Sequence, residues 1–167
     1  CRNLAAWICD AFTPNLTIVG TITVTSATTV SISGIRLQTN SAVFLAVTGS
    51  AASIVNLENC YLNCSNNTGI TFSSSSASSV INIKDCKGNL GTTGIGLFAH
   101  SSAGRMEITY TNITNTGAST AASTCSAGII NMLYTFLTSP VTTSSTSAFT
   151  WDYVSIDCAS LNTTAAT

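Results

Sequence analysis

Three carboxylates of this chain could form the acid–base machinery of a polysaccharide-cleaving site. Enzymes that hydrolyse sugar chains generally use a pair of carboxylates that flank the bond to be cleaved. Glu58 and Asp85 are separated by 27 residues, and a fold that repeats at about this interval would let them approach each other, with Glu107 beside Asn82. Glu58, Asp85 and Glu107 are therefore the candidate catalytic residues. The alternative interpretation is surface polarity, in which Asn59 and Asp85 occupy the turn after a strand.

The chain offers no nucleophilic set and no cofactor motif. His100 is the single histidine, and no Cys or Asp lies near it in the sequence to complete such a set. We expect His100 to be an exposed loop residue. The carboxylates do not cluster as calcium ligands do, so the sequence predicts neither a metal nor a cofactor.

The seven cysteines could bind a metal, form disulfides or pack in the interior; they are residues 1, 9, 60, 64, 86, 125 and 158. An odd number excludes complete pairing within the chain. Cys60, Cys64 and Cys86 have a spacing loosely suited to a metal, but no C-x-x-C pair occurs. Cys60 and Cys86 recur at one position of a repeated segment, with Cys158 as a further candidate for it, and Thr111 and Thr135 stand there elsewhere. Stacked small side chains explain this placement and favour packing, while a Cys60–Cys86 disulfide and the redox compartment stay open.

The composition indicates an ordered domain with a hydroxyl-rich surface and excludes two classes of partner. Only 7% of residues are charged, whereas 45% are hydrophobic and the mean hydropathy is +0.41. The net charge is −1, and only Lys84 and Lys87 among the five cations are close neighbours, so no nucleic-acid interface is predicted. No apolar run reaches the ~20 residues that cross a bilayer, so no membrane insertion is predicted.

A segment of alternating apolar residues recurs about every 25 residues. Its leading apolar residues are separated by 25, 26, 25, 24 and 24 residues, and they are Val30, Val55, Ile81, Met106, Ile130 and Val154. Gly69, Gly94 and Gly117 mark a second recurring point, where a turn with positive φ is expected before a further strand. Each repeat thus contains at least two short strands and turns. This layout predicts an all-β parallel β-helix, or solenoid, of about five rungs, each rung being one circuit of the chain.

Stacking the rungs predicts which side chains form the core. The second inward ladder consists of Ile32, Leu57, Ile83, Ile108, Met132 and Ile156, and the third of Leu37, Leu62, Gly88, Ile113 and Leu137. The positions between them should face outward; they are Asn56, Asn82, Glu107 and Asn131. Glu58 and Lys84 should be neighbours on adjacent rungs.

The two ends of the chain are expected to differ from the repeat. Residues 3–12 form an apolar segment that stops before Pro14, which predicts a short helix. We therefore divide the chain into an N-terminal helical cap or linker (1–14), a β-helix domain (15–160) and a C-terminal tail (161–167). The chain begins at Cys1 rather than Met, as expected of a processed product or a part of a longer polypeptide.

The segments Val55-Asn-Leu-Glu-Asn-Cys60 and Ile81-Asn-Ile-Lys-Asp-Cys86 resemble the strand motifs of the right-handed parallel β-helix superfamily. This superfamily includes pectate-lyase-like enzymes, bacteriophage tailspikes and tail fibres, capsid-surface fibres and bacterial adhesins. The resemblance covers residues 28–158, and the hydroxyl-rich, charge-poor composition is most like that of the viral appendage proteins. It implies a homotrimer on a virion surface or outside the cell, in contact with other virion or surface proteins.

Three functions follow as hypotheses. The first is a structural virion or surface protein, a segment of a fibre, spike or capsid decoration protein that forms a rigid rod and binds host-surface glycans. The second is a polysaccharide lyase or glycoside hydrolase of pectate-lyase-like type that uses Glu58, Asp85 or Glu107. The third is a bacterial adhesin domain. The scattered carboxylates favour the first, which is not an enzyme.

Overall fold

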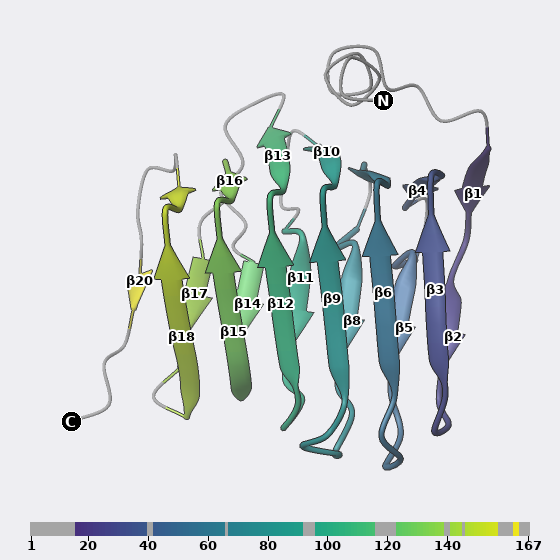
Figure 1. The fold of residues 1–167 in the computed structure, drawn as a ribbon, viewed down its shortest axis with the longest axis vertical. Helices are drawn as coiled ribbons and strands as arrows, with labels where there is room; N and C mark the ends of the chain where they lie inside the picture. The colour runs from purple at the N-terminus through teal and green to yellow at the C-terminus, as the bar shows by residue number, and fades with distance from the viewer. Residues whose placement is uncertain are drawn as a thin grey trace.

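The chain forms a parallel β-solenoid with three sheets. The computed structural model describes residues 16–39, 42–65, 67–91, 96–115, 123–138, 141–144, 146–156 and 162–163. Each strand pairs in parallel with the strand one rung further along, so the sheets run the length of the solenoid (Figure 1). The predicted fold class is confirmed.

The chain visits the three sheets in a fixed order. Sheet A consists of β1 (Thr17–Val19), β4 (Arg36–Gln38), β7 (Tyr61–Cys64), β10 (Lys87–Leu90), β13 (Asn112–Asn115), β16 (Phe136–Leu137) and β19 (Ser155–Ile156). Sheet B consists of β2 (Ile22–Val24), β5 (Leu45–Val47), β8 (Ile70–Phe72), β11 (Phe98–His100), β14 (Ser123–Cys125), β17 (Val141–Thr143) and β20 (Asn162–Thr163). Sheet C consists of β3 (Thr29–Ser33), β6 (Ile54–Glu58), β9 (Val80–Lys84), β12 (Arg105–Thr109), β15 (Gly128–Leu133) and β18 (Ser147–Asp152).

The expected count of about five rungs is slightly off. The sheets hold seven, seven and six strands, and each rung adds one strand to each sheet. The described residues form strands and no helix, and the helix predicted over residues 3–12 lies outside them. The cap at 1–14 and most of the tail at 161–167 lie there too, so those domain boundaries stay predictions.

Most of the predicted core ladders are confirmed. In sheet C, Val30, Val55, Ile81, Met106 and Ile130 are successive partners, and in sheet A the third ladder is correct throughout, Gly88 included. Most of these side chains are fully buried. Each large aliphatic side chain that leaves water contributes roughly 1.5–3 kcal/mol.

The last member of two ladders was predicted wrongly. Ile130 pairs with Phe149 and Met132 with Trp151, not with Val154 and Ile156. Phe149 follows Ile130 by only 19 residues, because the last rung has shorter connections than the others. A prediction that assumes a constant repeat length therefore places the next core residue too far along the chain.

The turn predicted at the recurring glycines lies elsewhere. Gly69 is not among the residues with positive φ, and Ile70 pairs with Phe98 rather than with Ile95. A Cβ at Gly69 would lie 2.5 Å from a Phe44 ring carbon. Glycine is needed here because any side chain would collide with the packed Phe44 ring. Gly94 and Gly117 lie outside the described residues.

The positive-φ turn instead follows each strand of sheet C. One left-handed residue there redirects the chain from sheet C to sheet A on every rung: Gly34, Asn59, Asp85, Tyr110, Tyr134 and Tyr153. The interpretation of Asn59 and Asp85 as turn residues is confirmed. Asn and Asp adopt this conformation more readily than other non-glycine residues.

The serine-rich run at residues 73–79 is an ordered corner between sheets B and C. Ser74 and Ser79 are buried, and their hydroxyl oxygens lie 2.9 Å apart. The Ser102 hydroxyl on the next rung donates to the Ser74 carbonyl at 2.6 Å. A run that would indicate a flexible linker in isolation is thus fixed by hydrogen bonds between rungs.

Candidate functional site

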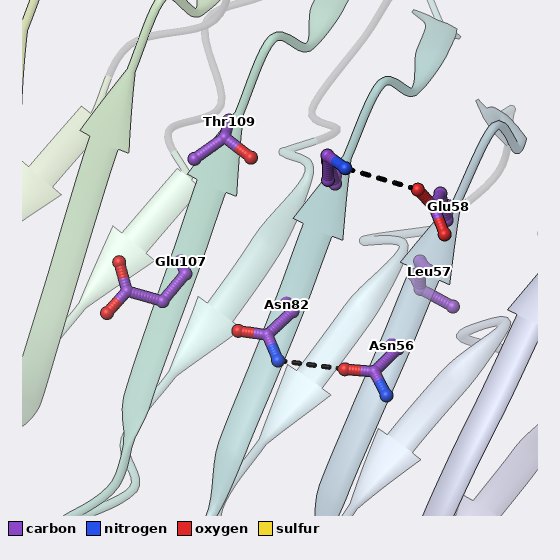
Figure 2. Close-up of a pocket in the computed structure, with 7 residues that line it drawn as sticks. Asn56, Leu57, Glu58, Asn82, Glu107 and Thr109 are labelled. Atoms are coloured by element: carbon purple, nitrogen blue, oxygen red, sulfur yellow. Dashed lines mark hydrogen bonds and ion pairs between the residues drawn. The ribbon is translucent and has the colours of Figure 1, made fainter.

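The outer face of sheet C presents a column of amide and carboxylate side chains. Because side chains alternate along each strand, the residues between two core positions point outward. Asn56, Asn82, Glu107 and Asn131 are successive partners in this column, as predicted. The Asn82 amide donates to the Asn56 side-chain oxygen at 2.8 Å (Figure 2). The Asn131 amide donates to Glu107 Oε1 at 2.9 Å.

Each candidate carboxylate lies beside a cation. Lys84 Nζ is 3.3 Å from Glu58 Oε1, which confirms that these residues are neighbours across rungs, and 3.7 Å from Asp85 Oδ2. The hydrogen bond to Glu58, with the charges of Glu58 and Asp85, raises the pKa of Lys84. Arg105 Nε lies 2.7 Å from Glu107 Oε1 on the same strand. These side chains are about half exposed, except Glu107 at 28%, so solvent screens the pairs and their contribution to stability is small.

The face is hollowed by an open groove across β6, β9 and β12. Its volume is about 440 Å³, and it is lined by Asn56, Leu57, Glu58, Asn82, Lys84, Glu107 and Thr109. Glu58 and Glu107 both line it from β6 and β12, with β9 between them (Figure 2). Asp85 does not line it and lies at the corner beside Lys84. The structure thus brings two of the three candidate residues to one groove, and the groove offers amides, carboxylates and one ammonium as hydrogen-bonding groups.

A row of tyrosines lies next to this groove and was not predicted. Tyr110 follows the groove residue Thr109, and its ring stacks on Tyr134, which stacks on Tyr153. The ring centroids are 5.1 and 4.8 Å apart, and the three residues are 54%, 47% and 71% exposed. Each has a φ near 50°, which is unusual for a bulky residue. The recurrence of Tyr two residues after the core positions Ile108 and Met132 is the sequence signal that could have revealed the row.

His100 is buried, so the prediction of an exposed loop histidine was wrong. It lies in β11, is 1% exposed and stacks on Phe72 with ring centroids 4.7 Å apart. Nε2 lies 3.2 Å from the Ile129 carbonyl, which can only accept, so Nε2 carries the proton. The Ser102 N–H then donates to Nδ1 at 3.4 Å. The imidazole is a neutral core group with both nitrogens engaged.

Burial lowers the pKa of His100 and predicts a loss of stability in weak acid. Above pH ~6.5 the imidazole is neutral in both the folded and unfolded chains and adds no pH dependence. As the pH falls below that value, only the unfolded chain gains the proton, so the free energy of unfolding decreases by at most about 1.4 kcal/mol per pH unit. Urea denaturation at pH 7.5, 6.5 and 5.5 measures this slope. His100→Gln should flatten the slope above pH 5.5, and an unchanged slope in that variant would contradict the assignment.

Four described cysteines are free and buried: Cys60, Cys64, Cys86 and Cys125. Cys60 and Cys86 share one position with Thr111 and Thr135, and all four are buried, which agrees with the packing interpretation. The remaining cysteines lie outside the described residues. Within the described ranges, no group of three or more His, Cys, Asp or Glu side chains could hold a metal ion.

The fold and this face define the class of the protein as an all-β parallel β-solenoid with a polar groove on one outer sheet face. No protein-family model, curated protein or solved structure matches the chain. The part of the chain that the structure describes contains no helix with the length and hydrophobicity needed to cross a bilayer.

Proposed function

We propose that this chain is a rigid structural segment of a virion or cell-surface fibre, spike or capsid decoration protein, and that it binds surface glycans along sheet C. The observation that carries the proposal is the engagement of the candidate carboxylates. Glu58, Asp85 and Glu107 each lie within an ion pair, and Glu107 also accepts a hydrogen bond from Asn131. Such pairs join residues within and between rungs and favour a passive surface.

The groove gives the proposed binding role its chemistry. A volume of about 440 Å³ lies within the range of small-ligand sites, and the lining supplies donors and acceptors. Sugar hydroxyls are both donors and acceptors, so an extended glycan can hydrogen bond to the amide column of Asn56 and Asn82. Tyr110, which follows the groove residue Thr109, adds an exposed aromatic ring.

The proposed assembly is a homotrimer of parallel rods at a virion surface or outside the cell. Continuous sheets make each solenoid stiff, which suits the display of a binding face at a distance from its attachment. A bacterial adhesin domain would use the same fold and groove, and the genes adjacent to this one would separate the two contexts.

Binding without cleavage is the expected result when the purified chain is incubated with bacterial surface polysaccharides. Sedimentation should give a mass of three chains, and the polysaccharide should keep its chain length. Asn82→Ala should weaken binding by about tenfold, since it removes hydrogen bonds from the centre of the groove. Thr71→Ala, on the outer face of sheet B, is the matched control and should bind normally. A folded monomer that binds none of the polysaccharides would refute the proposal.

A polysaccharide lyase or hydrolase is the second candidate, and one observation favours it. Glu58 and Glu107 line the same groove, as a pair of acid–base carboxylates would. If the chain shortens a polysaccharide, and Glu58→Gln or Glu107→Gln abolishes that shortening while the protein stays folded, the enzyme hypothesis replaces the first.

A further inference from the structure

Cys60 and Cys86 occupy equivalent places on two successive rungs. Each follows a left-handed corner residue, Asn59 with φ 52° and Asp85 with φ 51°. The strands before the two cysteines are paired, and so are the strands after them. Their α carbons therefore stack at about the ~4.8 Å spacing of paired strands, within the ~4.4–6.8 Å that a disulfide spans.

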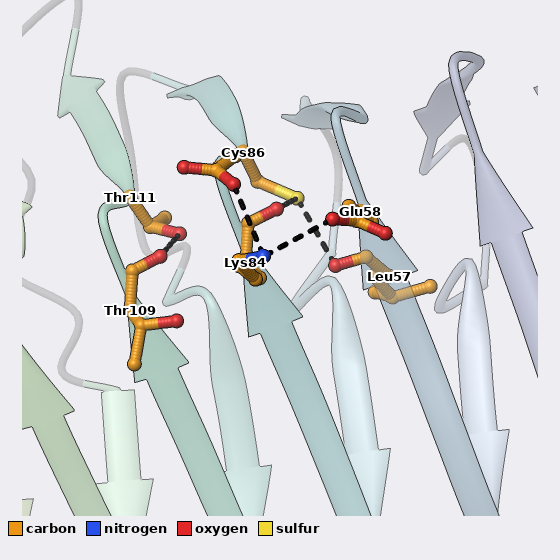
Figure 3. Close-up of polar contacts among 7 residues, drawn as sticks. Leu57, Glu58, Lys84, Cys86, Thr109 and Thr111 are labelled. Atoms are coloured by element: carbon orange, nitrogen blue, oxygen red, sulfur yellow. Dashed lines mark hydrogen bonds and ion pairs between the residues drawn. The ribbon is translucent and has the colours of Figure 1, made fainter.

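The two thiols are fully buried, and both lie close to backbone carbonyls. Cys60 Sγ lies 3.4 and 3.5 Å from the carbonyl oxygens of Glu58 and Ile32. Cys86 Sγ lies 3.3 and 3.6 Å from the carbonyl oxygens of Lys84 and Leu57 (Figure 3). Each thiol thus reaches a carbonyl of its own rung and one of the rung before.

Sulfur is not needed for this packing. Thr135 takes the same place two rungs further on, and its hydroxyl donates to the carbonyls of Leu133 and Ile108 at 3.2 and 3.1 Å. Thr111, on the rung between, donates to the Thr109 carbonyl at 3.0 Å (Figure 3). Threonine therefore satisfies this position, and the two adjacent rungs that carry cysteine instead gain a chemistry that threonine lacks.

We propose that Cys60 and Cys86 are an oxidisable pair that a peroxide converts to a disulfide joining two rungs. The Cys60 thiolate attacks one oxygen of hydrogen peroxide, the O–O bond breaks, and the departing hydroxide takes a proton to become water. Cys86 sulfur then attacks the resulting sulfenic acid, the S–S bond forms, and the S–O bond breaks to release a second water. Two thiols and one peroxide thus give one disulfide and two waters, with two electrons passing from sulfur to peroxide.

The electrostatics of the pair favour Cys60 as the attacking sulfur. A hydrogen bond from the Cys86 thiol lowers the pKa of Cys60 against the opposing effect of burial. The same hydrogen bond, together with burial, raises the pKa of Cys86, which keeps its proton. One thiolate shared with one thiol is the reactive state of such a pair. Cys64, four residues away, is different, because burial raises its pKa to about 12.

The test is a peptide map of the folded full chain after treatment with hydrogen peroxide and alkylation of the remaining thiols. Trypsin releases residues 37–84, which contain Cys60 and Cys64, and residues 85–87, which contain Cys86. We expect these two peptides to be joined, with a mass lower by two hydrogen atoms than their sum, and to separate on reduction. The oxidised protein should also show a higher urea midpoint that dithiothreitol reverses, because the bond constrains the unfolded chain.

Two variants assign the bond. Cys60→Thr, which copies the residue of later rungs, should lose the joined peptides, and Cys64→Ala should keep them. Cys60→Ser gives the same test if Cys60→Thr does not fold. Absence of the joined peptides in the treated wild-type protein, or their persistence in a folded Cys60→Thr variant, overturns the proposal.

Discussion

Replacement of Ile108 by alanine is expected to lower the free energy of unfolding by about 2–5 kcal/mol. Ile108 is fully buried in β12, where it lies between Ile83 on one rung and Met132 on the next. The substitution removes buried aliphatic surface and leaves a cavity that two strands held in their ladders cannot close. Domains of this kind have a total stability of about 5–15 kcal/mol, so the loss is a large share of it.

Thr109→Ala is the matched control, since the next residue of the same strand points to the opposite face. Its free energy of unfolding should stay within about 0.5 kcal/mol of the wild type. Urea denaturation followed by circular dichroism measures both variants. Equal losses in Ile108→Ala and Thr109→Ala would contradict the alternation of core and surface positions in sheet C.

Gly88→Ala is expected to destabilise the protein by about 1–3 kcal/mol or more. Gly88 occupies the third core ladder between Leu62 and Ile113. A Cβ there would overlap the Leu62 carbonyl oxygen and would lie 2.8 Å from Ile113 Cδ1. Replacing glycine normally stabilises a chain by about 0.4–1 kcal/mol where the backbone allows it, so the sign of the change is diagnostic.

Double variants at Gly88 and Gly69 distinguish overlap with the backbone from crowding by neighbouring side chains. Gly88→Ala combined with Ile113→Val should remain destabilised, because the closest obstacle is the main chain of β7. Gly69→Ala meets the Phe44 ring and Cys64 Sγ instead, so Phe44→Leu should restore part of its stability. The urea midpoints of Gly88→Ala and Gly69→Ala, each alone and in its double variant, measure these stabilities. If Ile113→Val restored the stability lost in Gly88→Ala, backbone overlap would be refuted as the cause.

The surface of sheet C links the proposed function to these core positions. Asn82 lies between the core residues Ile81 and Ile83, so its amide is held in the groove by the ladders on either side. A binding face built on strands in register is rigid, which reduces the entropy lost when an extended ligand binds.

The sequence by itself determined the repeat, the fold class and the central core ladders. Val55, Ile81 and Met106 lie at nearly constant intervals, and residues that alternate around them must face opposite sides of a strand. The same register placed Glu58 beside Lys84 and Glu107 beside Asn82, because stacked parallel strands bring equal positions together.

Only the tertiary structure decided the features that depend on differences in loop length between rungs. The last rung reaches sheet C after 19 residues, so Phe149 rather than Val154 continues the ladder of Ile130. The register of sheet B pairs His100 with Phe72 and buries it, whereas its serine-rich neighbours indicated a loop.

The candidate binding face on sheet C was predicted only in part. Glu58 and Glu107 could be placed on one outer face from their register, but the cations that engage them were only partly foreseen, since side-chain direction depends on local packing. The stack of Tyr110 on Tyr134 arises because both stand at left-handed corners of successive rungs. Local alternation thus sets which face a residue takes, and the three-dimensional stacking of unequal rungs sets which residues meet there.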